Sequence, residues 1–376
     1  MITASKLHGT VVAALIVAAS AASTAGAQSA FDIGARVAPQ FHSYDIKSPT
    51  NIKISEFTLP VFVLIPATSH LSFDVGTSYT NAQVDNTSGT TKTSSSISGL
   101  TDTQVRANYT LGTDFVVLTA GVNIPTGQST VNADQLTAAS LIGNDFLAFP
   151  ISNMGTGFGG TAGVAVARPV GDWSLGIGAS ARHSASYDPF DAGTTTATLH
   201  YQPGNEYRVR GGVDRAFGTG RVNFGLTYSK FGDDDLGGSV YNTGDRWLSQ
   251  LGLNNNFGPG MLTVAGWDLY RPSGALADGT TTGHENILAA SLAYGVQTGS
   301  TTIIEPNVEG RLWSQSAGIP SSTIATLGLR SQFSLIGFAV SPSVGYSIGR
   351  LGTGSAGSGV TADLTGWQAT LGIRLR

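Results

Sequence analysis

Charged side chains recur at every second position in several segments of the chain. Arg208, Arg210 and Asp214 alternate with apolar residues such as Tyr207 and Val209. Successive side chains on a β-strand point to opposite faces, so this spacing gives the strand one charged and one apolar face. Charges on one face can pair with one another across a lumen, or they can form rings that set the ion and solute preference of a pore. The sequence leaves both interpretations open.

Such charges fall on or near the less apolar face of candidate strands along much of the chain. An Arg or Lys that faces lipid at the bilayer midplane costs about 2–4 kcal/mol, so in a membrane protein these side chains should point inward. The predicted pore-lining residues are Arg106, Arg168, Arg182, Arg208, Arg210, Asp214, Arg246, Asp268, Glu305, Glu309, Arg311 and Arg330. Two groups are spaced as paired networks: Arg208, Arg210 and Asp214 beside Asp245 and Arg246, and Glu305, Glu309 and Arg311.

Catalytic and metal-binding patterns find little support. His183-Ser184-Ala185 is the nearest approach to a nucleophile motif, but the outer-membrane phospholipase family places Ser two residues after its His. Asp233-Asp234-Asp235 could hold Ca²⁺ through carboxylate oxygens, although a solvated acidic turn is the commoner reading. The glycines do not form a phosphate-binding loop between a strand and a helix. We therefore expect a protein that is not an enzyme, with no cofactor and no metal site.

The segment 126–157 differs from the other connections because it is long and partly apolar. Asp134 is a plausible helix N-cap and Gly143 a plausible helix end. An apolar segment of this length should not remain in water, so we predict that it folds into the mouth or lumen and narrows a pore. The alternative is packing on the rim or against a neighbouring protomer. The predicted constriction residues are Leu136, Ile142, Phe146, Leu147 and Phe149.

The elements that position these residues are predicted to be sixteen strands, with fourteen as the alternative. Their connections are alternately short and long, which is the pattern of a transmembrane up-and-down β-barrel with periplasmic turns and extracellular loops. The long connections are expected at 43–53, 83–98, 126–157, 188–203, 232–243, 272–282, 315–321 and 350–361. Propellers and β-helices would show a repeat of fixed period, and the chain has none.

Composition agrees with an exported membrane barrel. Residues 1–27 have the short polar start, apolar run and small-residue cleavage pattern of a secretory signal, leaving 28–376 as the barrel. The net charge of −4 argues against nucleic acid as a partner, and cysteine is absent. No later apolar stretch is long enough for a spanning helix, so a membrane-embedded chain must form a closed barrel. The expected partners are the outer-membrane lipid bilayer, the barrel-assembly machinery and a small-molecule solute.

A family resemblance rests on residues 99–127. Gly99-Leu100-Thr101-Asp102-Thr103 opens one strand, and the next strand ends in Asn123-Ile124-Pro125-Thr126-Gly127. This resembles the outer-membrane transporter family named for the meta-pathway of phenol degradation, although Thr101 replaces the second Gly of that pattern. The resemblance implies passive uptake of small, often hydrophobic or aromatic, molecules. The alternative is a non-transporting structural or surface-interaction barrel with a closed lumen.

Overall fold

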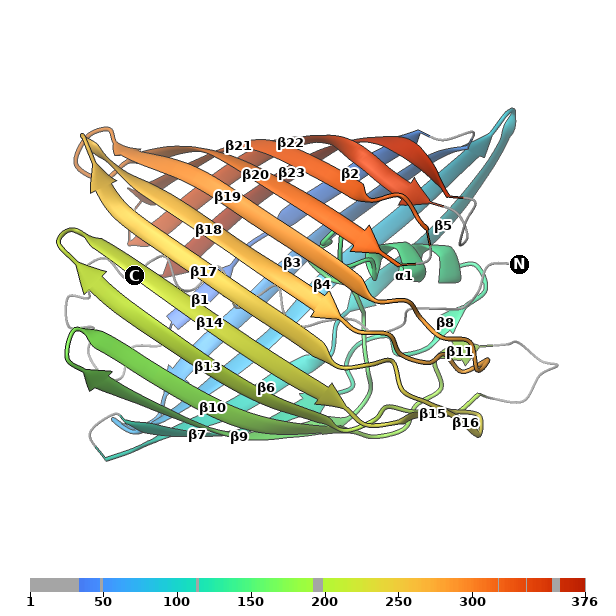
Figure 1. Cartoon of the computed structure of the whole chain (residues 1–376), viewed down its shortest axis with the longest axis horizontal. Helices are drawn as coiled ribbons and strands as arrows, with labels where there is room; N and C mark the ends of the chain where they lie inside the picture. Colours follow the sequence, from blue (N-terminus) through green and yellow to red (C-terminus); the bar gives the residue numbers. More distant parts are fainter. Residues whose placement is uncertain are drawn as a thin grey trace.

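The chain forms a closed antiparallel barrel of sixteen crossings in a computed structural model (Figure 1). The structure describes residues 34–47, 50–112, 115–191, 199–316, 318–335, 337–353 and 359–375. The predicted signal segment, 1–27, lies outside the described residues. The crossings are β1 with β2 (Gly34–Val37, Gln40–Lys47), β3 (Asn51–Pro66), β4 (Leu71–Ser88), β5 with β6 (Thr91–Leu100, Thr103–Leu111), β7 (Val116–Ile124), β9 (Gly159–Val170), β10 (Trp173–Ser184), β13 (Glu206–Phe217), β14 (Gly220–Phe231), β17 (Arg246–Phe257), β18 (Gly260–Arg271), β19 (Glu285–Gln297), β20 (Ile303–Gln315), β21 (Ser322–Leu335), β22 (Phe338–Thr353) and β23 (Val360–Leu375).

Two crossings are interrupted. β1 and β2 share one register with β23 and are separated at Ala38-Pro39, where proline cannot donate a backbone hydrogen bond. β5 and β6 both pair with β4, but one extra residue is accommodated between them at Thr101-Asp102. The last strand, β23, pairs with β1 and β2 and closes the barrel, so the sheet has no open edge. This confirms the predicted fold class.

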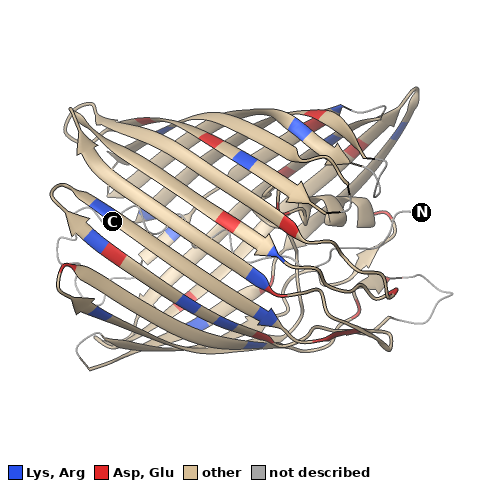
Figure 2. Cartoon of the chain, viewed as in Figure 1, with Lys and Arg blue, Asp and Glu red and all other residues tan. Residues whose placement is uncertain are grey.

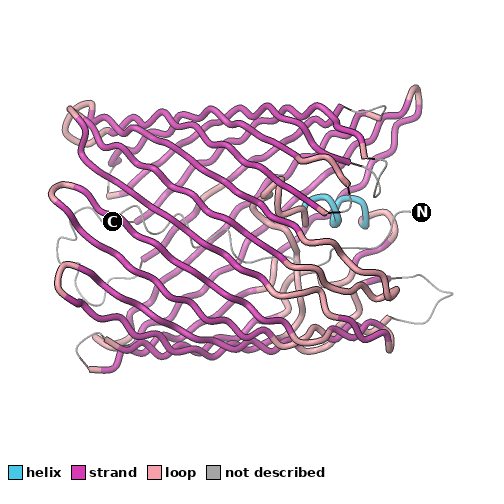
Figure 3. Tube along the Cα trace, in the orientation of Figure 1, coloured by secondary structure: helices cyan, strands magenta, loops and turns pink. Residues whose placement is uncertain are grey.

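Short turns join the strands at one end of the barrel, called here the turn end. Gly171, for example, begins the connection from β9 to β10 with φ +60°, and Gly218 begins that from β13 to β14 with φ +51°. A two-residue hairpin turn needs positive φ, which glycine adopts without a steric penalty. The turns therefore confirm the predicted short connections, and Figure 3 shows the longer connections gathered at the opposite, loop end.

Two predicted loops are wrong. Most of 43–53 belongs to β2 and β3, and 83–98 belongs to β4 and β5, which form a hairpin that projects beyond the loop end (Figure 1). Segment 126–157 instead contains the short helix α1 (Leu136–Ile142) and β8 (Val131–Asn132). β11 (Phe190–Asp191), β12 (Tyr201–Gln202), β15 (Asp234–Leu236) and β16 (Ser239–Tyr241) are short strands in other loops.

The outer wall is apolar along the strands. Leu226 and Val209, for example, are cross-strand neighbours of other outward residues and are exposed. Outward aromatic residues line the turn end, among them Trp173, Phe257 and Phe338. An apolar band flanked by aromatic residues is the surface that a bilayer requires of a barrel. Among the described residues, no helix is long and apolar enough to cross a membrane.

Candidate functional site

Ten of the twelve predicted pore-lining residues lie on the inner face of the barrel. Strand alternation shows this directly: Tyr207 and Val209 are exposed on the outer face, so Arg208 and Arg210 between them point inward. The same parity places inward Arg106, Arg182, Arg208, Arg210, Asp214, Arg246, Glu305, Glu309, Arg311 and Arg330. Figure 2 shows charged positions distributed along the strands as well as in the connections.

Arg168 and Asp268 are corrections, because both lie on the outer face. Arg168 stands opposite Leu175 and two residues from the end of β9, and Asp268 stands opposite Leu288 near the loop end of β18. A lipid-facing charge costs several kcal/mol only near the midplane and about 0–1 kcal/mol near the interfaces. Both residues lie close to a strand end, so the cost of about 0–1 kcal/mol applies to them. The prediction that both point inward did not take this dependence on depth into account.

At least five of the inward arginines form ion pairs with inward or loop carboxylates, namely Arg208, Arg221, Arg271, Arg311 and Arg330. The predicted Arg311–Glu309 pair is present at 2.6 Å. The other predicted network is wrong in its partners: Arg208 pairs with Glu206, and Asp214 pairs with Arg221 at 2.6 Å. Arg330 pairs with Glu305 at 2.7 Å. These pairs satisfy charges that would otherwise be left without a partner in the wall.

The inner wall carries more positive than negative charge. The sequence prediction missed four inward arginines, namely Arg36, Arg221, Arg271 and Arg374, because each lies near a strand end where the alternation is short. With these, eleven arginines and seven carboxylates point inward from the described barrel strands, an excess of four positive charges. The whole chain carries −4. The inner wall is therefore of opposite sign to the molecule as a whole.

Segment 126–157 packs against the inner wall at the loop end. Phe146 stacks on Trp313 of β20 with ring centroids 5.4 Å apart, and Phe149 meets Tyr44 of β2 edge to face at 5.5 Å. Phe146 and Leu147 have no exposed surface. Their apolar cluster takes in inner-face residues of β2–β5 and β19–β23. The segment thus lies inside the barrel, in contact with the inner face of β2–β5 and β19–β23.

Four of the five predicted constriction residues, Ile142, Phe146, Leu147 and Phe149, are buried in this packing. Leu136 is 37% exposed and lies outside the cluster. The helix begins one residue later than predicted, since its N-cap is Gln135 rather than Asp134, while Gly143 ends it as predicted.

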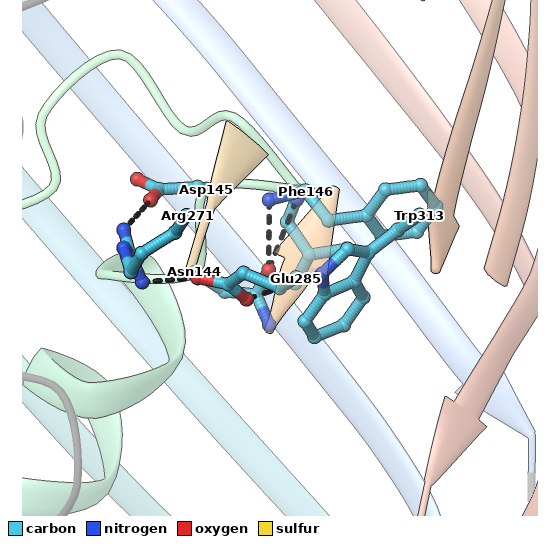
Figure 4. Close-up of polar contacts among 7 residues, drawn as sticks. Asn144, Asp145, Phe146, Arg271, Glu285 and Trp313 are labelled. Carbon is cyan, nitrogen blue, oxygen red and sulfur yellow. Dashed lines mark hydrogen bonds and ion pairs between the residues drawn. The ribbon is translucent and has the colours of Figure 1, made fainter. Parts of the chain in front are cut away.

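Polar anchors fix the same segment to the wall. Arg271 at the end of β18 bridges Asp145 of the segment and Glu285 of β19, with Arg271 Nη2 2.9 Å from Asp145 Oδ2 (Figure 4). The Arg311 guanidinium donates to the Phe146 carbonyl oxygen at 2.5 Å. On the far side of the barrel, the Ile151 backbone N–H donates to the fully buried Glu56 carboxylate at 2.9 Å. Anchors on three strands therefore define one seated position.

The two stems of the segment are joined by a single carboxylate. Asp102 Oδ1 accepts the Gly127 N–H at 3.0 Å, and Asp102 Oδ2 accepts the Thr156 N–H at 2.6 Å and the Asn123 side-chain amide at 2.8 Å. A Cβ on Gly127 would overlap the Met154 carbonyl oxygen, so only glycine fits there. We call Asp102, Asn123, Gly127 and Thr156 the stem clasp.

The stem clasp explains why these residue types occur at this spacing. The extra residue between β5 and β6 is a β-bulge, a feature that bends a strand and re-aims a side chain. Thr101 and Ser78 exchange hydrogen bonds across the bulge, which turns Asp102 toward the segment. The residues on which the family resemblance rests therefore hold the segment 126–157 in place, a role that was not predicted from the sequence.

A tyrosine cluster joins two further loops outside the barrel wall. Tyr187 and Tyr201 pair as an isolated bridge, with their rings edge to face at 5.4 Å. Burial and the nearby Asp234 carboxylate raise the pKa of Tyr201 and of Tyr187, and burial raises the pKa of Tyr241 to about 12. Asp234 also accepts the Gly204 N–H at 2.7 Å. The acidic run 233–235 thus contributes to loop structure, and among the described residues no group of acids or histidines is arranged for a metal ion.

No protein-family model matches the chain, and no curated protein matches it. Its shape is similar to that of the anion-selective porin of Comamonas acidovorans, with 14% identity over 92% of this chain and 99% of that one and a TM-score of 0.41. It is also similar to OprB of Pseudomonas putida (10% identity, 90% and 92% covered, TM-score 0.47) and to a deletion mutant of the monoaromatic hydrocarbon channel TodX (11%, 91% and 90%, TM-score 0.45). Since each TM-score is below 0.5, the fold rests on the strand pairing of this chain itself.

Proposed function

We propose that the protein is an outer-membrane channel for passive movement of small solutes, narrowed at its loop end by the segment 126–157. The observation that carries the proposal is the combination of a closed barrel, an apolar outer band and a charged inner face with a segment anchored inside it. Bacterial barrels place short turns in the periplasm and longer loops outside. In this orientation the segment lies at the extracellular entrance. The barrel needs no cofactor and no catalytic group for this function.

The path that the proposal favours runs along the inner face of β7–β17. The apolar cluster around Phe146 includes inner-face residues of β2–β5 and β19–β23, but none of its described members comes from β7, β9, β10, β13, β14 or β17. The inner side of that arc carries Arg182, Arg208 and Arg210, of which Arg210 is exposed. A solute that enters beside the segment would therefore meet guanidinium groups first.

Uptake of hydrophobic or aromatic solutes is the finer part of the proposal. It is supported by the resemblance of residues 99–127 to the transporter family of the phenol meta-pathway. It is also supported by apolar side chains on the inner face, such as Trp267 and Leu269 of β18, which are only partly buried against the apolar cluster. A lumen that offers both guanidinium groups and apolar side chains suits small amphipathic molecules.

Planar-bilayer conductance tests the proposal. The wild-type chain is compared with a variant in which 130–152 is replaced by a short Gly-Ser linker, and with a control shortened at the tip of the β4–β5 hairpin. We expect wild-type conductance, a clear increase on deletion of 130–152 and no change in the control. Absence of conductance from both the wild type and the deletion variant would overturn the proposal.

A closed lumen is the second candidate, because Phe146 and Leu147 are fully buried against the wall. This structural or surface-interaction barrel predicts a silent wild type and a conducting deletion variant. The same recordings therefore separate the two functions without a further experiment.

A further inference from the structure

Two arginines at the turn end of the inner wall are available for a ligand. Arg36 of β1 and Arg374 of β23 lie directly opposite each other where the first and last strands meet, and both are exposed on the inner face. Like charges at opposed positions repel, since cross-strand Cβ atoms are about 4.5–5.5 Å apart. No acidic side chain among the described residues forms an ion pair with either arginine. An anion between them would remove the repulsion.

An aromatic side chain lies beside the arginine pair. Arg36 is also opposite Phe62 of β3, and Phe62 is 46% exposed although it faces inward. Gly76 of β4 makes room for this ring, since a Cβ there would be 2.7 Å from two ring carbons. Leu64, the next inward residue on β3, is 44% exposed. Arg36 is therefore cross-strand to an apolar stretch of β3 that is exposed on the inner face.

Other inward arginines do not offer this combination. Arg208, Arg311 and Arg330 already have carboxylate partners. Arg210 is exposed, but its cross-strand neighbours on the inner face are Gly178 and Thr227, which provide no ring. At the seam between β1 and β23 the described wall places two directly opposed arginines without a described carboxylate partner, one of them opposite an exposed aromatic residue.

We propose that Arg36, Arg374 and Phe62 form a weak site for small aromatic carboxylates. The guanidinium groups donate to the two carboxylate oxygens in the planar, two-bonded geometry that arginine favours. The aromatic ring of the ligand packs on Phe62 in an offset arrangement. The site lies at the end opposite the segment 126–157, so it acts on solute that has passed the entrance. This inference deepens the proposed channel function and rests on it for its role in transport.

The test uses benzoate as the probe, with benzyl alcohol as its uncharged analogue and chloride as an anion without a ring. Reversal potentials give the benzoate-to-chloride permeability ratio, and benzoate line broadening with the detergent-solubilised full chain gives binding without any need for conductance. We expect R36Q/R374Q to weaken benzoate binding about tenfold or more, since hydrogen bonds to charged groups contribute about 1.5–3 kcal/mol. F62A should weaken benzoate binding while leaving chloride permeability unchanged.

Arg215→Gln is the matched control, because Arg215 lies at the same end of the barrel but on the outer face, over Trp173. G76A tests the role of the Phe62 ring in a second way, since the added Cβ displaces the ring without removing it. Heat-modifiable migration verifies that each variant is a folded barrel. If the wild type conducts but binds benzoate as strongly as R36Q/R374Q does, the proposed site is overturned and the proposed channel function stands. Binding that depends on the arginine pair without any conductance supports the site and overturns the channel.

Discussion

Removal of the Asp102 carboxylate should release the segment 126–157 while leaving the barrel intact. Asp102→Ala leaves the Gly127 and Thr156 backbone N–H groups and the Asn123 amide without their acceptor. A hydrogen bond to a charged group contributes about 1.5–3 kcal/mol. Loss of the two backbone bonds alone therefore destabilises the seated segment by about 3–6 kcal/mol, which raises the released population about 10²–10⁴-fold. The strand ladders are untouched, so the melting of the barrel should change little.

Chymotrypsin measures this release directly. The segment contains no Lys or Arg, but it contains Phe146 and Leu147, which are completely buried in the seated position. When opening and closing are fast relative to cleavage, the cleavage rate follows the open population. We therefore expect cleavage at 146–147 to be at least a hundredfold faster in Asp102→Ala than in the wild type, with the barrel folded throughout.

Asp74→Asn is the matched control, since Asp74 is an inner-wall carboxylate that accepts a hydrogen bond from the Asn108 side-chain amide and none from the segment. Asp102→Asn should fall between wild type and Asp102→Ala, because the amide oxygen can still accept but the amide nitrogen opposes a donor. If Asp102→Ala is cleaved within about threefold of the wild-type rate, the stem clasp does not hold the segment, and the bulge at 101–102 needs another explanation.

Three further changes test the packing and the wall. Trp313→Ala removes the ring on which Phe146 stacks and should destabilise the seated segment by about 3–5 kcal/mol, seen as faster chymotrypsin cleavage. Gly127→Ala cannot fit beside the Met154 carbonyl, so we expect a folded barrel with conductance like that of the 130–152 deletion. Leu226→Arg places a charge on the outer face mid-strand and should lower unfolding free energy by about 2–4 kcal/mol in lipid refolding titrations, whereas Thr227→Arg on the inner face should have a much smaller effect.

The alternation of residues such as Tyr207 and Arg208 was enough to predict the barrel, its strand number and the face of most charges. It could not find the ends of strands that extend beyond the membrane. In the β4–β5 hairpin, residues 88–94 are all polar or glycine and all exposed, so toward the tip no apolar face separates inside from outside. Because both faces there meet water, the hydrophobic period vanishes although the hydrogen-bonded ladder continues.

The contacts of the segment 126–157 could be predicted only in part from the sequence, for a different reason. The apolar character of Phe146 and Leu147 predicted that the segment would leave water, and it does. Their partners are distant in sequence. Arg311, which donates to the Phe146 carbonyl oxygen, lies 165 residues after Phe146, and Trp313, on which the Phe146 ring stacks, follows Arg311 on β20. Such contacts depend on barrel closure and register, and no local spacing encodes them. The prediction also placed Arg168 on the wrong face. It used the free-energy cost of a lipid-facing charge at the bilayer midplane, whereas that cost depends on the depth of the residue in the bilayer.

The position of the stem clasp follows from the physics of a long loop held within a wide lumen. Ordering the backbone of each residue costs about 1–2 kcal/mol, so a segment of this length folds inward only where burial and hydrogen bonds offset that loss. Phe146 and Phe149 supply the burial, but contacts at the tip leave both stems free to move. By joining Gly127 and Thr156, Asp102 shortens the flexible span from both ends. A bulge in the wall at this level is therefore what turns an apolar loop into a seated element of defined position.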